Sequence, residues 1–584
     1  MSTPADPIPL RRLIYALLII VALADVLGRI LSVANVYEPH LHRSDPGRSA
    51  AAILLPLAAV RAPEAAVLLA AGQTVWEDIG PDEPARLWPS TRPEPMPTLG
   101  GNDRSRWATI RALVDHGTYA IGHRRLLSPG DPTQYVDEGI TTEDGWRTLD
   151  KVLHPERQEF YSSKPPLLPT LLAGEYWLLK HMFGWSLTDR EGRWLVVRTI
   201  LVTVNLLPML VYLVLLARLA ERFGTTDWGR LYVVAAGAFA TFLTPFAIVI
   251  NNHTVAACSA LFALYPVLAA LAPSPLTPLL PRGERGEAAP VSSAPGSSFP
   301  LSPASGERGR GEGGHPAPRL FLLAGLFAGF TATCELPAAS FLAALFVLLL
   351  VRWPGRTLAF FVPAAALPVA GLLLTNYLAL GELLPAYSKL QTAYYQYEGS
   401  YWRVDPGQVK RGIDWAWQKE SKAAYAFHLL LGHHGLFSLT PIWLLAAAGI
   451  VLTMFRRSDA PQGLWVSLIM GRTDLGRSAG LVVVSALALF LSVVVIGFYL
   501  FVAARMSNNY GGWTSGPRWF IWLTPFWLLT MLPAADRLAG CRWGRALGYL
   551  LLAVSVVSVS YPAWNPWRHP WIYNFFEAQG WVRY

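Results

Sequence analysis

The sequence predicts an all-α, polytopic membrane protein of about eleven transmembrane helices. Of its 584 residues, 53% are hydrophobic and only 15% are charged, and the mean hydropathy is +0.33. Several segments of ~17–25 residues carry almost no charge, and such a helix is long enough to cross a hydrocarbon core of ~30 Å. Residues 481–503, LVVVSALALFLSVVVIGFYLFVA, are an example.

The first apolar segment follows Arg11 and Arg12 and lacks a small-residue cleavage site, so we interpret it as a retained span. Further along, Pro337 directly after a short apolar segment marks a break between two short crossings. The predicted spans are 13–34, 194–217, 231–250, 254–272, 320–336, 338–351, 358–379, 436–455, 480–503, 518–534 and 546–562.

Arginines near the ends of the spans predict the orientation. With these crossings, five arginine-bearing sites fall on one side, which we assign to the cytoplasm. The protein is then a multi-pass protein of the inner membrane. The candidate site residues described below would face the periplasm. These sites contain Arg11 and Arg12; Arg218, Arg222 and Arg230; Arg352 and Arg356; Arg456, Arg457, Arg472 and Arg477; and Arg537, Arg542 and Arg545.

The orientation divides the chain into regions. Residues 1–34 hold the cytoplasmic N-terminus and first span, and residues 35–193 form one large periplasmic loop with juxtamembrane helices. More spans follow at 194–272 and 319–562, the latter with periplasmic loops at 380–435 and 504–517, and residues 563–584 form an aromatic periplasmic tail.

Two apolar patches in the large loop, 51–72 and 166–185, are expected to lie on the membrane surface, because both are interrupted by charges. A twelfth crossing at 166–185 is the alternative. Residues 273–318 contain a near-repeat, PLTPLLPRGERGE against PLSPASGERGRGE, and cannot bury a core. We expect them to form a disordered cytoplasmic insertion.

The formal net charge of +9 does not indicate nucleic-acid binding. The arginines lie at the ends of apolar segments and in the large loops, as expected for orientation in a membrane and for contact with anionic lipids or substrates. Cys258, Cys334 and Cys541 are too scattered to imply a disulfide.

Residues 100–111, GGNDRSRWATIR, provide the first candidate site. Apolar residues recur at helical spacing from Trp107 onward and Gly117 closes the segment, which predicts a short amphipathic helix with Asn102 or Asp103 at its N-terminus. In the simplest interpretation Asp103 is a helix cap. The helix dipole and nearby arginines also keep Asp103 ionised, and an ionised carboxylate can accept a proton from a hydroxyl.

The second candidate is YSSKPPLLPTLL, residues 161–172. Pro165 and Pro166 hold the chain extended and then open a helix. Lys164 is thereby held at the membrane surface next to Tyr161, where it suits a lipid phosphate. The alternative is a lysine that only snorkels to the interface.

The third candidate is NNYGGWTSGPRWF, residues 508–520, whose glycines permit close approach of a ligand. Arg518 begins a span from the outer side and could bind phosphate as a fork. The alternative is an ordinary turn with a boundary arginine.

Three further polar positions lie at the outer ends of spans. Asn252 and His253 follow Asn251 in a tight turn, for which a helix cap is the alternative, and Glu335 in TCELP is an unusual carboxylate at the end of an apolar span. For the adjacent His433 and His434 we prefer hydrogen bonding over metal binding.

Together these motifs resemble the membrane glycosyltransferases of the GT-C superfamily, in the style of glycosyltransferase family 39, which includes protein O-mannosyltransferases and bacterial aminoarabinose transferases. The resemblance rests on one span, D-x-x-RW-A at 103–108, Y-x-x-KPPL at 161–167 and a series of spans. GG-x-x-x-GPRW and GLFSLTP resemble elements of bacterial members. The resemblance covers most of the chain except residues 35–99 and 273–318.

The resemblance implies a GT-C fold and an inverting transferase that uses a polyprenyl-phosphate sugar as donor and a lipid, glycan or protein as acceptor. Asp103 would be the catalytic base, and Lys164 and Arg518 would hold the leaving phosphate. Further acidic residues of the family are missing here, since Arg104 follows Asp103 and Ser163 precedes Lys164. No metal ligand is assigned, although a divalent cation is left open. The predicted substrate-binding residues are Arg106, Tyr161, Lys164, Asn252, His253, Glu335 and Arg518.

Two rival functions were weighed. A transporter or flippase of a lipid-linked sugar should show internal repeats and ionisable residues at mid-membrane. The spans show no such repeat, and their charges gather at one face. An envelope assembly protein in which Asp103 is only a cap is the other rival, and the concentration of DRSRW, YSSKPPL and GPRW on one predicted side argues against it.

Overall fold

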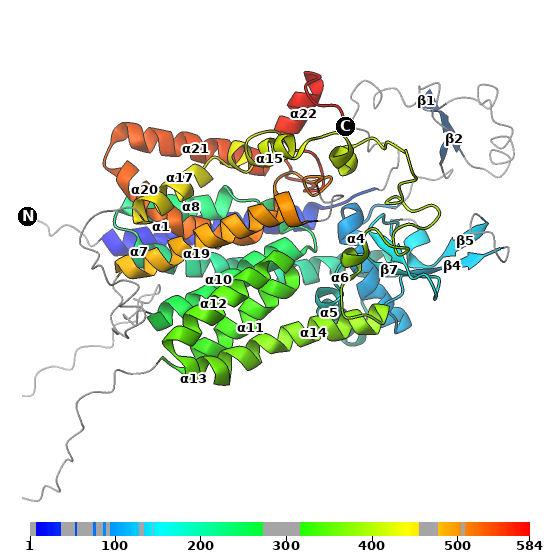
Figure 1. The fold of residues 1–584 in the computed structure, drawn as a ribbon, viewed down its shortest axis with the longest axis horizontal. Helices are drawn as coiled ribbons and strands as arrows, with labels where there is room; N and C mark the ends of the chain where they lie inside the picture. The colour runs from blue at the N-terminus through cyan, green and yellow to red at the C-terminus, as the bar shows by residue number, and fades with distance from the viewer. Residues whose placement is uncertain are drawn as a thin grey trace, which may run out of the picture.

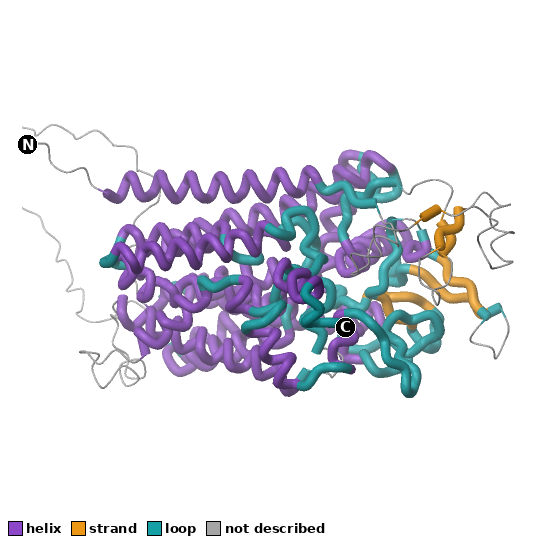
Figure 2. Tube along the Cα trace, turned by 90° about the horizontal axis from the view of Figure 1, so that it is seen from above, coloured by secondary structure: helices purple, strands orange, loops and turns teal. Residues whose placement is uncertain are grey.

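The computed structural model describes residues 7–36, 53–54, 74–77, 86–88, 94–127, 134–143, 145–271, 316–454, 477–503 and 508–584. These residues form an elongated bundle of roughly parallel helices, with shorter helices, strands and loops gathered at one end (Figures 1 and 2). We call this end the loop end. The N-terminus lies at the opposite end (Figure 1).

The apolar segments form helices close to the predicted places. Within the described residues, seven helices are long and apolar enough to cross a membrane, and the helices at 318–334, 336–352 and 443–454 are shorter. The long ones are Pro9–Ser32, Arg190–Phe223, Asp227–Phe246, Asn252–Leu271, Pro354–Leu380, Ala479–Val502 and Arg542–Ser560. The prediction of a helical polytopic protein is confirmed at this level.

The bundle helices have the following bounds: α1 Pro7–Ser32, α6 Arg190–Leu201, α7 Leu207–Phe223, α8 Asp227–Phe239, α9 Leu243–Phe246, α10 Asn252–Leu271, α11 Pro318–Cys334, α12 Ala339–Arg352, α13 Pro354–Arg356, α14 Val362–Leu380, α17 Trp443–Met454, α19 Arg477–Gly497, α20 Thr524–Ala539 and α21 Arg542–Ser560. Single wider turns at Val202–Leu206, Thr357–Phe361 and Phe498–Val502 extend α6 into α7, α13 into α14, and α19 beyond its end.

The helix breaks follow the local chemistry. The chain turns between α11 and α12 at Glu335 and Pro337, as predicted from the proline. The span predicted at 518–534 differs, because Arg518–Leu523 is a tight 3-10 segment and α20 begins only at Thr524. Similarly, the span predicted at 436–455 divides into α16, Leu436–Leu439, and α17.

The loop end holds α4, Gly100–Arg111, and α5, Leu167–Phe183, which pack against each other. The α5 helix occupies the predicted surface segment 166–185 and is not among the helices that qualify as spans. Short helices α15, Lys422–Leu430, and α22, Trp571–Ala578, lie at the same end (Figure 1).

Strands also form at this end, where the sequence analysis expected only helices. One antiparallel sheet has the order β5-β4-β7-β6 and consists of β4 Gly122–Leu126, β5 Tyr135–Glu138, β6 Lys151–Leu153 and β7 Glu159–Ser162. A second contains β1 Ile53–Leu54, β2 Thr74–Glu77 and β3 Arg86–Trp88 in that order. The membrane part is thus all-α, whereas the large loop mixes helices and sheets.

Charged residues at the opposite end join the helices to one another. Arg11 of α1 contacts Glu221 of α7 and Asp227 of α8, with nitrogen–oxygen distances of 2.6 Å for each. Asp536 of α20 accepts hydrogen bonds from the backbone amides of Thr225 and Thr226, at 2.7 and 2.9 Å. These contacts bring together the chain around residues 11, 221–227 and 536. Three of the five arginine sites predicted to share one side, 11–12, 218–230 and 537–545, therefore lie at the same end of the bundle.

Several predictions fall outside the described residues. They are the disorder of 273–318 apart from its last residues, most of the apolar patch at 51–72, and the arginines between 455 and 476.

Candidate functional site

The α4 helix is buried on all sides rather than amphipathic. Every residue from Asn102 to Arg111 is buried, including three arginines. The helix begins at Gly100, which adopts a positive φ of 62° against the ring of Trp567, so the start lies before the predicted Asn102 or Asp103. Gly117 closes the segment in the left-handed conformation, as predicted.

Asp103 occupies the fourth position of α4 and ties the helix to the bundle. Its Oδ2 accepts a hydrogen bond from the backbone amide of Leu99 at 2.8 Å, and its Oδ1 accepts one from Ile250 at 2.9 Å. The side chain is 1% exposed, and burial raises the pKa of Asp103 to about 7 against the effect of these two donors. The expectation that the helix dipole and arginines keep Asp103 fully ionised therefore needs correction, because desolvation outweighs them.

A β-hairpin brings a second aspartate to the lysine of the KPP motif. In the β6–β7 pair Lys151 lies opposite Ser162, so the next residues outward, Asp150 and Ser163, also meet, and the amide of Ser163 donates to the carbonyl of Asp150 at 3.1 Å. Lys164 Nζ then contacts Asp150 Oδ1 at 2.6 Å. The pair is partly open, with 20% and 17% of the two side chains exposed.

The start of α10 and the end of α11 form a second polar group. Asn251 Oδ1 accepts the amide of Thr254 at 2.8 Å and is the cap that the alternative interpretation expected. The next two residues point to α11 instead. Asn252 Nδ2 donates to Glu335 Oε1 at 2.6 Å, and His253 Nδ1 contacts the same carboxylate oxygen.

Two arginines connect these groups. Arg106 of α4 donates through Nη2 to Asn252 Oδ1 at 2.7 Å. Arg518 Nη1 lies 3.1 Å from His253 Nε2. The hydrogen-bonded chain therefore runs from α4 through α10 and α11 to the segment before α20.

The glycines of the NNYGGWTSGP loop make room for this arrangement. Gly511 and Gly512 have φ values of 87° and 74°. The Gly511 carbonyl accepts two hydrogen bonds from Arg518, at 3.2 and 2.9 Å, and a Cβ at Gly512 would lie 2.4 Å from Asp414 Oδ1. The close approach that the glycines were expected to allow is made here by the chain's own Arg518 and Asp414.

We call the assembled group the ionic centre. Its members come from six segments of the chain, with the Asp150–Lys164 pair joined to the others by charge interaction with Arg106 and Arg518, and all but Asp150 were predicted as site residues. They are Arg106, Asp150, Lys164, Asn252, His253, Glu335 and Arg518.

Charge coupling within the ionic centre sets the ionisation of Asp150. Burial opposes ionisation of Asp150, but Lys164, Arg518 and Arg106 outweigh it and hold the pKa of the carboxyl below its ordinary value of 3.8. Burial, helped by repulsion from the two arginines, lowers the pKa of Lys164 in spite of Asp150. Asp414 nearby differs, since burial raises its pKa to about 6. Asp150 is thus the carboxylate that the arginines and Lys164 keep ionised.

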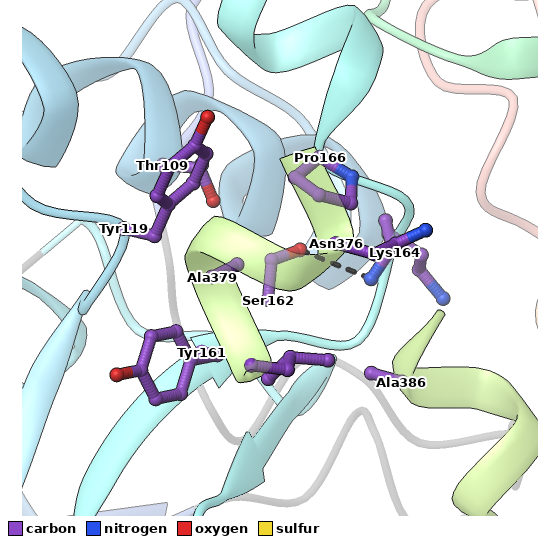
Figure 3. A pocket seen from close by; sticks show the side chains of 10 residues that line it. Thr109, Tyr119, Tyr161, Ser162, Lys164, Pro166, Asn376, Ala379 and Ala386 are labelled. Atoms are coloured by element: carbon purple, nitrogen blue, oxygen red, sulfur yellow. Dashed lines mark hydrogen bonds between the residues drawn. The ribbon is translucent and has the colours of Figure 1, made fainter. Parts of the chain in front are cut away.

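Two cavities flank the Lys164–Pro165–Pro166 segment. One is lined by Lys164, Tyr161 and Asn376 of α14 among others, and Figure 3 shows Asn376 beside the Lys164–Pro166 segment. Asn376 is 0% exposed, and neither of its amide atoms has a hydrogen-bond partner among the described residues. Such a group inside a cavity is matched to a ligand that both donates and accepts hydrogen bonds.

The second cavity is mainly apolar. Leu167, Leu168 and Phe330 line it, and Arg106 and Asn252 of the ionic centre form its polar side. As the structure stands, this cavity has room for about one water molecule, and its walls divide into an apolar side and a polar side.

Tyr161 is the predicted substrate-binding residue that lies apart from the ionic centre. Its hydroxyl donates to Glu159 and accepts from Arg157 at 3.2 Å, and its ring packs in a separate apolar cluster with Val152 and Tyr395. It lines the first cavity only (Figure 3).

The sequence analysis missed Asp150 and Asn376. Residues 151–162, KVLHPERQEFYS, carry the hairpin signal, because a proline-containing polar turn separates two short runs rich in Val, Phe and Tyr. The structure places a turn at this site, with Gln158 at φ 55°. A polar amide in the otherwise apolar α14 segment was the available signal for Asn376.

No family model and no curated protein matches this chain. Among solved structures it is similar to the archaeal oligosaccharyltransferase AglB from Archaeoglobus fulgidus in complex with an inhibitory peptide and a dolichol-phosphate, with 12% identity, a TM-score of 0.39 and coverage of 97% of this chain and 57% of that one. The Archaeoglobus fulgidus oligosaccharyltransferase tethered with an acceptor peptide has 13% identity and a TM-score of 0.38, and the match covers 94% of this chain and 54% of that one. The same enzyme in complex with Zn and sulfate has 13% identity and a TM-score of 0.36, and the match covers 83% of this chain and 52% of that one. The chain thus spans little more than half the length of these structures, and the function proposed below rests on its own residues.

Proposed function

We propose that this protein is an integral-membrane glycosyltransferase that moves a sugar from a polyprenyl-phosphate donor to an acceptor hydroxyl or amine, with inversion at the anomeric carbon. The observation that carries the proposal is the ionic centre. Three cationic side chains, Arg106, Lys164 and Arg518, converge beside a largely apolar cavity at one end of a bundle of membrane-length helices.

The cations suit the leaving group of such a reaction. When the bond between the sugar and the phosphate breaks, negative charge grows on the phosphate, and fixed positive groups stabilise that charge. The acids of the centre, Asp150 and Glu335, leave the three cations in excess. A polyprenyl chain that enters and widens the small cavity lined by Leu167, Leu168 and Phe330 would place its phosphate near Arg106.

Asp150, rather than Asp103, is the base in this proposal. Both donors to Asp150 reach Oδ1, while both oxygens of Asp103 already hold backbone amides and its side chain is almost fully buried. In the step itself, the acceptor oxygen forms a bond to the anomeric carbon and gives its proton to Asp150. The bond from that carbon to the phosphate oxygen breaks, and its electron pair stays with the polyprenyl phosphate.

The acceptor would enter through the cavity that holds Asn376. Its amide, without a partner among the described residues, can donate to and accept from a hydroxyl, and Lys164 on the same cavity wall connects it to Asp150. A lipid, a glycan or a protein side chain could supply that hydroxyl.

The test is sugar transfer in membrane vesicles supplied with a panel of radiolabelled polyprenyl-phosphate sugars. We expect label to move to an acceptor in wild type, a fall of about 10²–10⁴-fold in Asp150→Asn, and a rate per folded molecule near wild type in Asp103→Asn. Protein levels and melting temperatures serve as the control for folding.

The opposite order of the two variants would return the base to Asp103. Labelled lipid that crosses the bilayer unchanged would favour a flippase, the rival function. Absence of transfer from every donor, with the protein folded, would refute the transferase.

A further inference from the structure

A second buried polar cluster lies at the loop end, built from histidines that the proposed reaction does not use. The chain has 12 histidines, and four of them contact one another here. They are His428 on α15, His433 and His434 in the loop that follows, and His569 before α22. The preference for hydrogen bonding of the two adjacent histidines is met, since their Nδ1 atoms lie 2.6 Å apart.

One carboxylate completes a ligand set within this cluster. Glu420, His428 and His433 each offer a ligand atom, and these atoms all lie within 4.8 Å of one another. In a tetrahedral site with bonds of about 2.0–2.1 Å, ligand atoms lie about 3.4 Å apart. The rings of His428 and His433 are stacked with their centroids 4.2 Å apart, so one ring has to turn out of the stack for the three atoms to converge on one ion.

Tyrosines surround the ligand set and orient it. Tyr584 Oη lies 2.6 Å from His433 Nε2 and also donates to Glu420, and Tyr510 donates to the other oxygen of the same carboxylate. Carboxylate and imidazole ligands of metal sites are commonly held by such partners. The Tyr584 hydroxyl lies between two of the three ligands, where it can act as a fourth ligand or give way to water.

Protein hydrogen bonds alone leave this cluster incomplete. His428 Nδ1 and His434 Nε2 are buried without a hydrogen-bond partner among the described residues, and His434 is 0% exposed. Buried imidazole nitrogens normally have a partner, and one without a protein partner points to a bound water or ion.

We propose that Glu420, His428 and His433 form a binding site for one divalent transition-metal ion of the zinc class. Two imidazoles and one carboxylate are ligands that zinc prefers. The ion would join the Glu420 segment to the C-terminal Tyr584 through its hydrogen-bonded shell. This inference is independent of the proposed transferase function, because none of these side chains belongs to the ionic centre.

The experiment measures metal on the full-length protein purified in detergent. The protein is stripped with a chelator, reloaded with Zn²⁺ and analysed by inductively coupled plasma mass spectrometry, and its affinity is measured by competition with a fluorescent zinc indicator. We expect one zinc per chain in wild type and in the matched control His181→Ala, which changes an exposed histidine on α5. Absence of stoichiometric zinc from both proteins would overturn the proposal.

Ligand variants sharpen the test. Glu420→Gln keeps the shape of the side chain, and His428→Ala changes a half-buried residue, so both are expected to fold. Zinc affinity should fall by about 100-fold or more in each, and about 10-fold in Tyr584→Phe, whose hydroxyl orients the ligands. Wild-type affinity in the first two variants would refute the assignment.

A spectroscopic measurement on wild type covers the case in which a variant misfolds. Co²⁺ in place of Zn²⁺ should give the visible absorption bands of a tetrahedral nitrogen–oxygen site. Bands of a hexa-aqua ion only would also refute the site.

Discussion

The two ends of the helical bundle both bury charged side chains, but they use them differently. At the end with the N-terminus, Arg11 is shared between Glu221 and Asp227, and Asp536 accepts two backbone amides. These contacts join α1, α7, α8 and α20. At the loop end, three cations converge with two acids beside two cavities.

The difference separates charged residues that stabilise helix packing from charged residues that are available to a ligand. Paired charges that join helices stabilise the packing at the cost of their desolvation. Cations gathered beside a cavity favour a ligand that carries negative charge. Each prediction below sets a residue of the loop end against a matched residue elsewhere.

After Asp150, the largest effect is expected at Lys164. Lys164→Met removes a positive charge from the proposed phosphate site, so the kcat of transfer should fall about 10²–10³-fold. The matched change is Lys180→Met on α5, whose lysine pairs with Asp115 at 2.7 Å away from the ionic centre. Transfer assays on both in vesicles check this, and equal losses in the two variants would count against the phosphate role.

A pH-dependent stability is expected from Asp103. Because its pKa is raised from 3.8 to about 7 in the folded protein, the group contributes stability that is complete below pH 3.8 and is lost as the pH rises through about 7. The contribution is of the order of a few kcal/mol. Wild type should therefore have a higher Tm at pH 5 than at pH 8, measured by differential scanning fluorimetry in detergent.

Asp103→Asn cannot titrate, so its Tm should change less over the same pH range. A wild-type Tm that rises steadily from pH 5 to pH 8, or an Asn variant with the same slope as wild type, would contradict this account.

At the opposite end, Arg11→Met should affect stability instead of chemistry. It leaves the half-buried Glu221 without its cation, whereas the exposed Asp227 keeps Arg230, for an expected loss of about 1–3 kcal/mol in the free energy of unfolding. The rate per folded molecule should stay near wild type. Arg12→Met leaves the Arg11 contacts in place and is the control. If the kcat of Arg11→Met fell by more than its amount of folded protein, Arg11 would contribute to the reaction as well as to stability, and the two ends would not differ in this way.

The smallest effect is expected from two buried asparagines. Asn205→Leu should destabilise, because its amide donates to the carbonyls of Ala247 and Val249 at 2.8 and 2.9 Å. Asn376→Leu should leave the Tm unchanged or raise it, since it removes an amide without a partner among the described residues, and should lower transfer about 10-fold, or about 1.4 kcal/mol. If both variants destabilise equally, Asn376 is not free for a ligand.

Much of the membrane part follows from the sequence because the hydropathy of a span is a local property. The break at Pro337, the closure at Gly117 and the helix within 166–185 each depend on residues adjacent in the chain. Charges in apolar surroundings were similarly visible, which is why Lys164, Glu335 and Arg518 could be predicted as site residues.

Asp103 shows where local reasoning ends. Its position near a helix start and its arginine neighbours predict an ionised carboxylate, yet α4 is packed inside the protein on every side, and desolvation outweighs both effects. Burial is a property of the whole fold and has no local signal. Asp150 is the converse case, because its partner Lys164 is set by strand pairing between β6 and β7.

The sequence by itself determined the apolar helices and the residue types available at their ends, because both depend on neighbours along the chain. Only the tertiary structure decided which of those residues meet. Arg106, Lys164, His253, Glu335 and Arg518 are brought together by packing of segments that lie tens to hundreds of residues apart, and the same packing chose Asp150 over Asp103 as the carboxylate that the arginines keep ionised. The physical reason is that contact and desolvation, which set a side chain's chemistry, are long-range consequences of the fold.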